Sequence, residues 1–143
     1  MDQHATTKVR PGAQPRLAVG IDLVQVDEVL EALAHFGDRY LHRVFTAHEL
    51  ACASGTGVVR ARHLAARFAA KEATMKALGL DDQLPAWRSI EVHQEPSGHC
   101  TLRLSDHSAE LARRACLSEF AVSLSCEGRF AAAVVFALGL CEP

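Results

Sequence analysis

The sequence has no apolar run that approaches the roughly 20 residues needed to span a bilayer, so we expect no membrane partner. Its first 16 residues also lack an apolar stretch, which argues against a signal peptide and favours a cytoplasmic protein. Strong net charge is absent too, because 15 Lys and Arg residues face 17 Asp and Glu residues for a formal net charge of -2. A chain this close to neutral lacks the global field of a nucleic-acid-binding protein, and no nucleic acid partner is expected.

Cysteine and histidine occur without the spacing of a disulfide framework or a metal site. The five cysteines are widely spread and form no CxxC pair, so neither a disulfide framework nor a zinc ribbon is expected. The eight histidines show no HExxH or other ligand spacing. A chain of 143 residues, 49% hydrophobic and 22% charged, fits one globular domain in a reducing compartment.

The order of the predicted elements favours an α+β fold, because hairpins are mixed with segregated helices. We expect a flexible tail over residues 1–16, a single domain over residues 17–143, and a connector over residues 36–45. The predicted strands are residues 17–24, 90–94, 100–104, 120–125 and 130–138, and the predicted helices are residues 27–34, 46–53, 59–78 and 105–117.

Asp22 is unusual because it lies inside the apolar strand predicted over residues 17–24. Period-2 alternation places it on one face with Ala18 and Gly20, whose small size leaves room beside it. A carboxylate in such a strand is costly unless it is paired, hydrogen-bonded or bound to a metal. The strand alone leaves two alternatives, a metal ligand or a strand-end Asp that caps the next helix or pairs with an Arg.

The helix predicted over residues 59–78 carries charges that also have two interpretations. Glu72 and Lys76 could form an i,i+4 surface pair worth roughly 0.3–0.5 kcal/mol. Lys71 and Arg67 could likewise be solvated surface charges. The alternative is a functional cluster, which depends on what the helix packs against.

Asp22 and Glu72 together suggest such a cluster. Two carboxylates from different elements can bind Mg²⁺, a hard cation that prefers oxygen ligands and keeps several waters. Lys71 and Lys76 beside them could contact phosphate as flexible point charges. Spacing alone makes this arrangement possible without making it specific.

Two motifs carry a resemblance to a known family. The GID of residues 20–22, followed by the RFAAKEATMKALG of residues 67–79, resembles the 4′-phosphopantetheinyl transferases, with the small holo-[acyl-carrier-protein] synthases as the most similar branch. The RxFTxxEL of residues 43–50 and the VSLS of residues 122–125 extend the resemblance. It runs over about residues 18–138.

The resemblance implies transfer of phosphopantetheine from coenzyme A to a serine of an apo acyl carrier protein. Asp22, Glu72 and Lys76 would be the catalytic residues, with Mg²⁺ on Asp22 and Glu72. Lys71, Lys76 and Arg67 would contact the coenzyme A. The resemblance also implies a homotrimer with active sites between subunits.

Two departures from the family pattern modify these expectations. Cys126 stands where the family usually has a histidine near the cofactor phosphates, and a neutral thiol supplies no positive charge. The first helix carries Asp27, Glu28 and Glu31, whereas the family's first helix is commonly basic and receives acidic carriers. We therefore expect a specialised carrier protein or a carrier domain. The alternatives are a coenzyme A-binding relative with reduced or lost turnover, and an interaction protein without a site.

Overall fold

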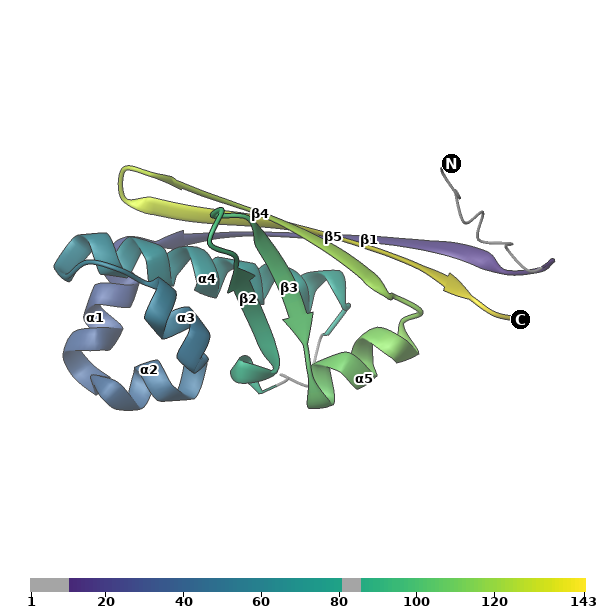
Figure 1. The fold of residues 1–143 in the computed structure, drawn as a ribbon, viewed down its shortest axis with the longest axis horizontal. Coiled ribbons are helices and arrows are strands. Elements are labelled where there is room, and N and C mark those ends of the chain that lie inside the picture. Colours follow the sequence, from purple (N-terminus) through teal and green to yellow (C-terminus); the bar gives the residue numbers. More distant parts are fainter. Residues whose placement is uncertain (1–10, 81–85) are drawn as a thin grey trace.

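The computed structural model describes residues 11–80 and 86–143 and places a long helix along one face of an antiparallel sheet (Figure 1). This arrangement confirms the expected α+β class. In chain order the elements are β1 (Gln14–Gln25), α1 (Val26–Phe36), α2 (Asp38–Val44), α3 (Ala47–Cys52), α4 (Gly57–Ala77), the 3-10 turn η1 (Trp87–Ser89), β2 (Ile90–Gln94), β3 (Cys100–Leu104), α5 (Asp106–Arg114), β4 (Glu119–Glu127) and β5 (Phe130–Cys141).

The main sheet has the strand order β1-β5-β4, so the last strand of the chain lies in the middle and β1 and β4 form the two edges. Both pairings are antiparallel, and Asp22 on β1 lies opposite Ala133 on β5. The β2–β3 hairpin forms a separate sheet. Figure 1 shows α1, α2 and α3 gathered at one end of α4 and α5 at the other.

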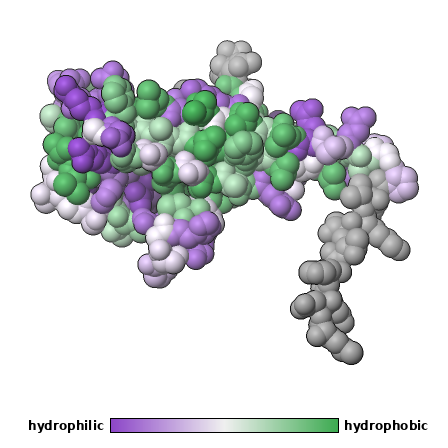
Figure 2. Space-filling model, turned by 90° about the horizontal axis from the view of Figure 1, so that it is seen from above, coloured by the Kyte–Doolittle hydropathy of each residue, from purple (hydrophilic) through white to green (hydrophobic). Residues whose placement is uncertain are grey.

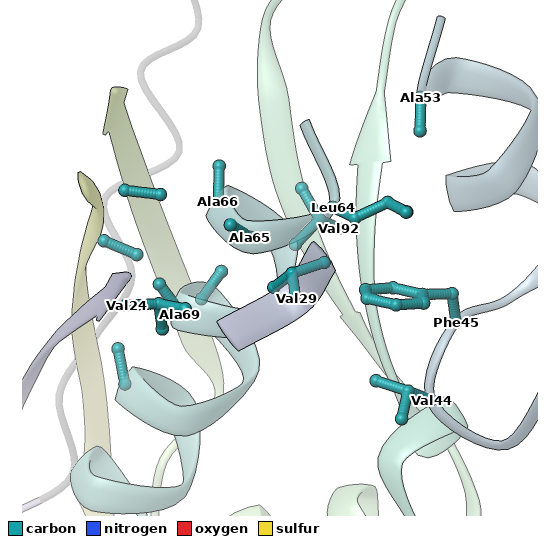
Figure 3. Close-up of a cluster of buried hydrophobic side chains, with 14 of the residues drawn as sticks. Val24, Val29, Val44, Phe45, Ala53, Leu64, Ala65, Ala66, Ala69 and Val92 are labelled. Carbon is teal, nitrogen blue, oxygen red and sulfur yellow. The ribbon is translucent and has the colours of Figure 1, made fainter. Parts of the chain in front are cut away.

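Helix α4 packs very closely on the sheet because both surfaces are made of small residues. Ala65, Ala69 and Ala73 of α4 are fully buried. Gly20 on β1 faces the same helix, and a Cβ added there would lie 1.8 Å from the carbonyl oxygen of Ala73. Figure 3 shows Ala65 and Ala69 within the apolar cluster that joins the sheet to the helices, with the ring of Phe45 on the far side. Helix and strand backbones are therefore in direct contact at Gly20.

The opposite face of the sheet is apolar, and no element of residues 11–80 or 86–143 covers it. Figure 2 looks down on this face and shows hydrophobic side chains gathered along the sheet. We call it the outer face, and its exposed large side chains are Leu17, Val19, Ile21 and Leu23 of β1 with Phe136, Leu138 and Leu140 of β5. These side chains are 44–69% exposed, which is unusual for a contiguous set of large apolar residues. Within the described residues no helix has the length and apolar character that a membrane crossing requires.

Two predicted boundaries differ from the structure. Strand β1 begins at Gln14, so residues 14–16 belong to the sheet and not to the predicted tail; residues 1–10 of that tail lie outside the described residues. The connector predicted over residues 36–45 contains helix α2, in which Leu41 and Val44 bury one short face. Charged and aromatic neighbours hide this three-residue spacing in the sequence.

The cysteine spacing indicated no disulfide framework, but the structure contains one disulfide bond. Cys116 and Cys141 are bonded, with their Cα atoms 5.1 Å apart. The pairing arises because the end of β5 runs beside the turn after α5, where a Cβ at Gly139 would lie 1.8 Å from the carbonyl oxygen of Cys116. A separation of 25 residues gives no local signal for such a contact.

Replacing Gly20 tests the close contact between β1 and α4. In Gly20→Ala the new Cβ meets a backbone carbonyl and not a flexible side chain, so strand and helix must separate. We expect the free energy of unfolding to fall by at least about 2 kcal/mol, measured by urea unfolding. Gln14→Ala at the exposed start of the same strand is the control. An unchanged urea midpoint in Gly20→Ala would contradict the contact.

Candidate active site

The contact between β1 and α4 brings Asp22 beside the last turn of the helix. The Lys76 ammonium lies 2.8 Å from Oδ1 of Asp22 and also donates to the carbonyl oxygen of Ile21 at 3.0 Å. The Lys76 side chain is 54% exposed, so a ligand can reach its ammonium, whereas that of Asp22 is 17% exposed. Asp22 thus has a cationic partner from α4, and not the Arg or helix-capping role considered from the sequence.

Glu72 lies one turn before Lys76 and shares this corner of the molecule. Burial raises the pKa of its carboxyl, the negative charge of Asp22 raises it further, and Lys76 opposes both effects. A carboxyl whose charged form is disfavoured by a neighbouring carboxylate is stabilised in that form by a cation between the two. The described residues contain no group of three or more His, Cys, Asp or Glu able to hold a metal ion. A cation here would therefore need most of its ligands from water or a bound molecule, as Mg²⁺ usually does.

Lys71 is adjacent to Glu72 in the sequence, but its side chain lies in the interior of the protein. Its side chain is fully buried, and its ammonium lies 2.9 Å from Oε2 of Glu49. It also donates to the carbonyl oxygens of Trp87, at 3.0 Å, and Ile90. Three acceptors use all three donors of an ammonium. Burial lowers the pKa of Lys71, and the charge of Glu49 opposes that shift. This arrangement does not fit the predicted phosphate contact, because no donor of Lys71 is left for a ligand.

Glu49 is the acceptor that makes this burial possible. As predicted from the sequence, it closes a capping box at the start of α3, where Oε2 accepts the Thr46 amide at 2.9 Å. Its other oxygen accepts the Val92 amide of β2 at 2.8 Å. The local pattern in the sequence shows the cap, but it does not show that the same carboxylate pairs with Lys71. Glu49 is thus an important residue that sequence reasoning found only in part.

Arg67 lies on another side of α4 and is almost completely buried. Its Nη1 donates to the carbonyl oxygen of His63 at 3.0 Å and its Nη2 to Oε1 of Gln94 at 2.7 Å, while its buried Nε has no partner. No carboxylate in the described part of the chain forms an ion pair with Arg67. A buried cation without an anion is costly, so this position favours binding of an anionic group.

The Arg67 side chain lines a cavity of about 460 Å³ between α4, the β2–β3 hairpin and β4, which we call the arginine cavity. The three free cysteines, Cys52, Cys100 and Cys126, all lie on its wall. Burial raises the pKa of Cys126 despite the nearby charges of Arg62 and Arg67, so its thiol stays neutral. The expectation that Cys126 adds no positive charge here is consistent with this shift.

The acidic pair and the arginine cavity lie at opposite edges of the sheet. Asp22 is on β1, the cavity wall includes β4, and β5 separates the two. On α4 the five-residue step from Arg67 to Glu72 corresponds to a rotation of about 140° around the helix axis. Each chain therefore presents one acidic half-site and one cationic half-site that face in different directions.

The two lysines of the helix offer a matched test of these assignments. Lys71→Met leaves the buried Glu49 carboxylate without its cation and should cost about 3–5 kcal/mol of stability. Lys76→Met removes an exposed ion pair and should cost less than about 1 kcal/mol. Chemical unfolding of both variants measures the difference. Equal losses would show that Lys71 is not the structural lysine.

Comparison with known proteins identifies the family of this chain. A family model described as the 4'-phosphopantetheinyl transferase superfamily matches residues 18–135. A holo-[acyl-carrier-protein] synthase of Chloroflexus aurantiacus is 41% identical, with 82% of this chain and 95% of that protein covered. One of Herpetosiphon aurantiacus is 37% identical, with 86% of this chain and 99% of that protein covered.

Solved structures agree with these relatives. An acyl carrier protein synthase of Mycobacterium tuberculosis is 36% identical, with a TM-score of 0.66 and coverage of 88% of this chain and 97% of that one. A complex of Chronobacterium ammoniagenes ACPS with CoA is 29% identical, with a TM-score of 0.76 and coverage of 89% and 99%. The resemblance carried by the GID and RFAAKE motifs is thus confirmed, and the chain belongs to the 4′-phosphopantetheinyl transferase superfamily.

Proposed function

We propose that this chain is a holo-[acyl-carrier-protein] synthase, which transfers 4′-phosphopantetheine from coenzyme A to a serine of an apo acyl carrier protein. The observation that carries the proposal is the meeting of Asp22, Glu72 and Lys76 at the contact between β1 and α4. These residues come from the two motifs that the family resemblance rests on. A scaffold with only a Glu72–Lys76 surface pair is disfavoured, because Lys76 pairs with Asp22 across 54 residues of sequence.

Asp22 and Glu72 would hold a Mg²⁺ ion. Both are oxygen donors, and the charge of Asp22 raises the pKa of Glu72, so a divalent cation relieves a repulsion that already exists in the fold. When bound, the ion supplies positive charge against the pyrophosphate of coenzyme A.

Lys76 would supply the positive charge that stabilises the leaving phosphate. The hydroxyl oxygen of the carrier serine attacks the phosphorus that bears the pantetheine arm and gives up its proton to water, the phosphoanhydride bond breaks, and adenosine 3′,5′-bisphosphate leaves. Negative charge grows on the leaving phosphate, and an ammonium within reach stabilises it. Lys76 is suited to this role because its side chain is half exposed and its present partner, Asp22, would turn to the metal.

Coenzyme A has anionic groups at both its pyrophosphate and its ribose, and they match the two half-sites. A single chain carries these half-sites at opposite edges of its sheet. One cofactor can contact both only if the acidic half-site of one chain meets the arginine cavity of another. The uncovered outer face supports such assembly, and a homotrimer is the arrangement we propose.

The carrier partner is a specialised acyl carrier protein or a carrier domain. The exposed surface of α1 carries Glu28 and Glu31, and Asp27 is paired with Arg129. Arg39 and Arg43 on α2 are the exposed cations nearby in the sequence. A carrier whose docking helix is uniformly acidic would meet like charge on α1. We propose that the reaction takes place in the cytoplasm.

Removing the acidic pair tests the transferase proposal. Asp22→Asn and Glu72→Gln should each abolish transfer of phosphopantetheine, measured as the mass gain of candidate apo carriers incubated with coenzyme A and Mg²⁺. Glu72→Gln should also remove any rise in melting temperature that Mg²⁺ gives the unmodified chain. Coenzyme A binding by the unmodified chain without transfer to any carrier would favour a relative that has lost turnover.

The pH dependence of metal-free stability gives a second measurement on the same variant. Because the folded state raises the pKa of Glu72, the fold favours the protonated carboxyl, and stability is lost as pH rises from about 4.5 through that raised value. Glu72→Gln has no such ionisation. Its free energy of unfolding, relative to the unmodified chain, should therefore increase over this range, and a constant difference would contradict the shift.

A mixing experiment tests whether a site is shared between chains. Glu72→Gln damages the acidic half-site and Arg67→Ala the cationic one, so each variant alone should be inactive. Random mixed oligomers would contain intact pairs of half-sites and recover roughly a quarter of full activity. Refolding the two variants together and assaying transfer measures this recovery. No recovery would place both half-sites in one chain.

Light scattering tests the role of the outer face in the same assembly. Val19 and Phe136 lie opposite each other on β1 and β5 and are both about half exposed. The unmodified chain should have three times the 15.5 kDa chain mass, whereas Val19→Glu with Phe136→Glu should have the mass of one chain. A trimer that survives both charges would exclude the outer face as the interface.

A further inference from the structure

We propose that His63 is a phosphate-binding residue for coenzyme A, acting beside Arg67 on the 3′-phosphate of the ribose. The inference rests on the proposed function and deepens it, because it assigns a residue that neither the motifs nor the family resemblance singled out. It starts from two buried polar atoms without a partner, Nδ1 of His63 and Nε of Arg67, whose residues line one cavity.

His63 and Arg67 are held together by helix geometry. They are one turn apart on α4, and the Arg67 guanidinium donates to the backbone oxygen of His63 at 3.0 Å. Both side chains line the arginine cavity. A ligand that binds the Arg67 guanidinium in this cavity therefore lies near the His63 imidazole.

The hydrogen bonding of the ring indicates which nitrogen can act. Nδ1 of His63 is buried and has no partner, and a buried N–H without an acceptor is more costly than a buried acceptor without a donor. The neutral ring therefore carries its proton on Nε2. That leaves Nε2–H as the donor that His63 can offer to a group in the cavity.

The other imidazoles near the cavity are engaged or exposed. His48 accepts the Gln94 amide at 3.1 Å and stacks on His93 with ring centroids 4.2 Å apart, so this pair supports the hairpin. His99 lines the cavity but is exposed on the turn between β2 and β3. Cys126 is neutral. His63 is thus the imidazole that a rigid helix holds in the cavity wall.

The chemistry of the cofactor selects the group that binds here. The pyrophosphate must lie at the reacting centre with Asp22, Glu72 and Lys76, because its bond is the one that breaks. The anion left to pair with the buried Arg67 guanidinium is the 3′-phosphate of the ribose. A cavity of about 460 Å³ is within the usual range for a small-molecule site and has room for that end of the cofactor.

Comparing coenzyme A with 3′-dephospho-coenzyme A tests the assignment. His63→Ala should raise KM for coenzyme A about tenfold with little change in kcat, since a hydrogen bond to a charged group is lost in ground and transition states alike. KM for 3′-dephospho-coenzyme A should not change. His63→Gln keeps an N–H donor and should lose less, and His107→Ala, exposed on α5, is the control.

The outcomes separate this inference from the function it rests on. Equal losses for the two cofactors, or no loss for either, would overturn the role of His63, whereas transfer by the unmodified chain would leave the proposed function intact. If no carrier is modified by any variant, calorimetric binding of the same two cofactors decides the role of His63. A melting temperature for each variant shows whether it is folded, and His63→Gln replaces His63→Ala in the comparison if the latter unfolds.

Discussion

The buried ion pair of Glu49 and Lys71 is the interaction on which the rest of the structure depends. It joins α3, α4, η1 and β2, because the carboxylate also accepts the Val92 amide and the ammonium also donates to the Trp87 and Ile90 carbonyl oxygens. Neither charge has solvent exposure, so each is tolerable only while the other stays in place. The pair therefore fixes the rotation of α4 about its axis.

That rotation decides what the neighbouring residues of α4 can do. With Lys71 directed toward Glu49, the next residue, Glu72, is directed toward Asp22, and Arg67 one turn earlier is directed into its cavity. Contact of Gly20 with the Ala73 carbonyl fixes the distance of the helix from β1. A fixed rotation and a fixed distance together hold two half-sites on a single rigid helix. The proposed role of Glu72 thus depends on the structural lysine next to it in the sequence, Lys71.

The sequence was most informative where local patterns determine structure. Thr46 and Glu49 predicted a capping box that the structure contains, and the apolar spacing predicted α4 to within two residues at each end. It could not distinguish the roles of Lys71 and Lys76, because burial of a lysine depends on a carboxylate that arrives from another element. The Cys116–Cys141 bond was missed for a similar reason, since it depends on where two distant chain segments meet.

Strand β1 shows how a clear pattern can still leave its meaning open. Its large apolar residues, such as Leu17 and Ile21, resemble a core-facing set, yet the small set with Gly20 faces the helix. The alternation of large and small residues defines two faces of the strand, but it does not show which face another element of the same chain covers. Only the alanines of α4, which need an equally small partner, identify the covered face, and they lie about 50 residues further along the sequence.

The exposed apolar side chains of the outer face also affect the behaviour of a newly made chain. A newly made chain displays a band of Leu, Val, Ile and Phe side chains on a regular sheet, and such surfaces aggregate when copies meet in the wrong orientation. Aggregation through this face during synthesis therefore lowers the yield of folded protein. Variants that fold slowly will be recovered mainly from the insoluble fraction, even when their chemistry is intact.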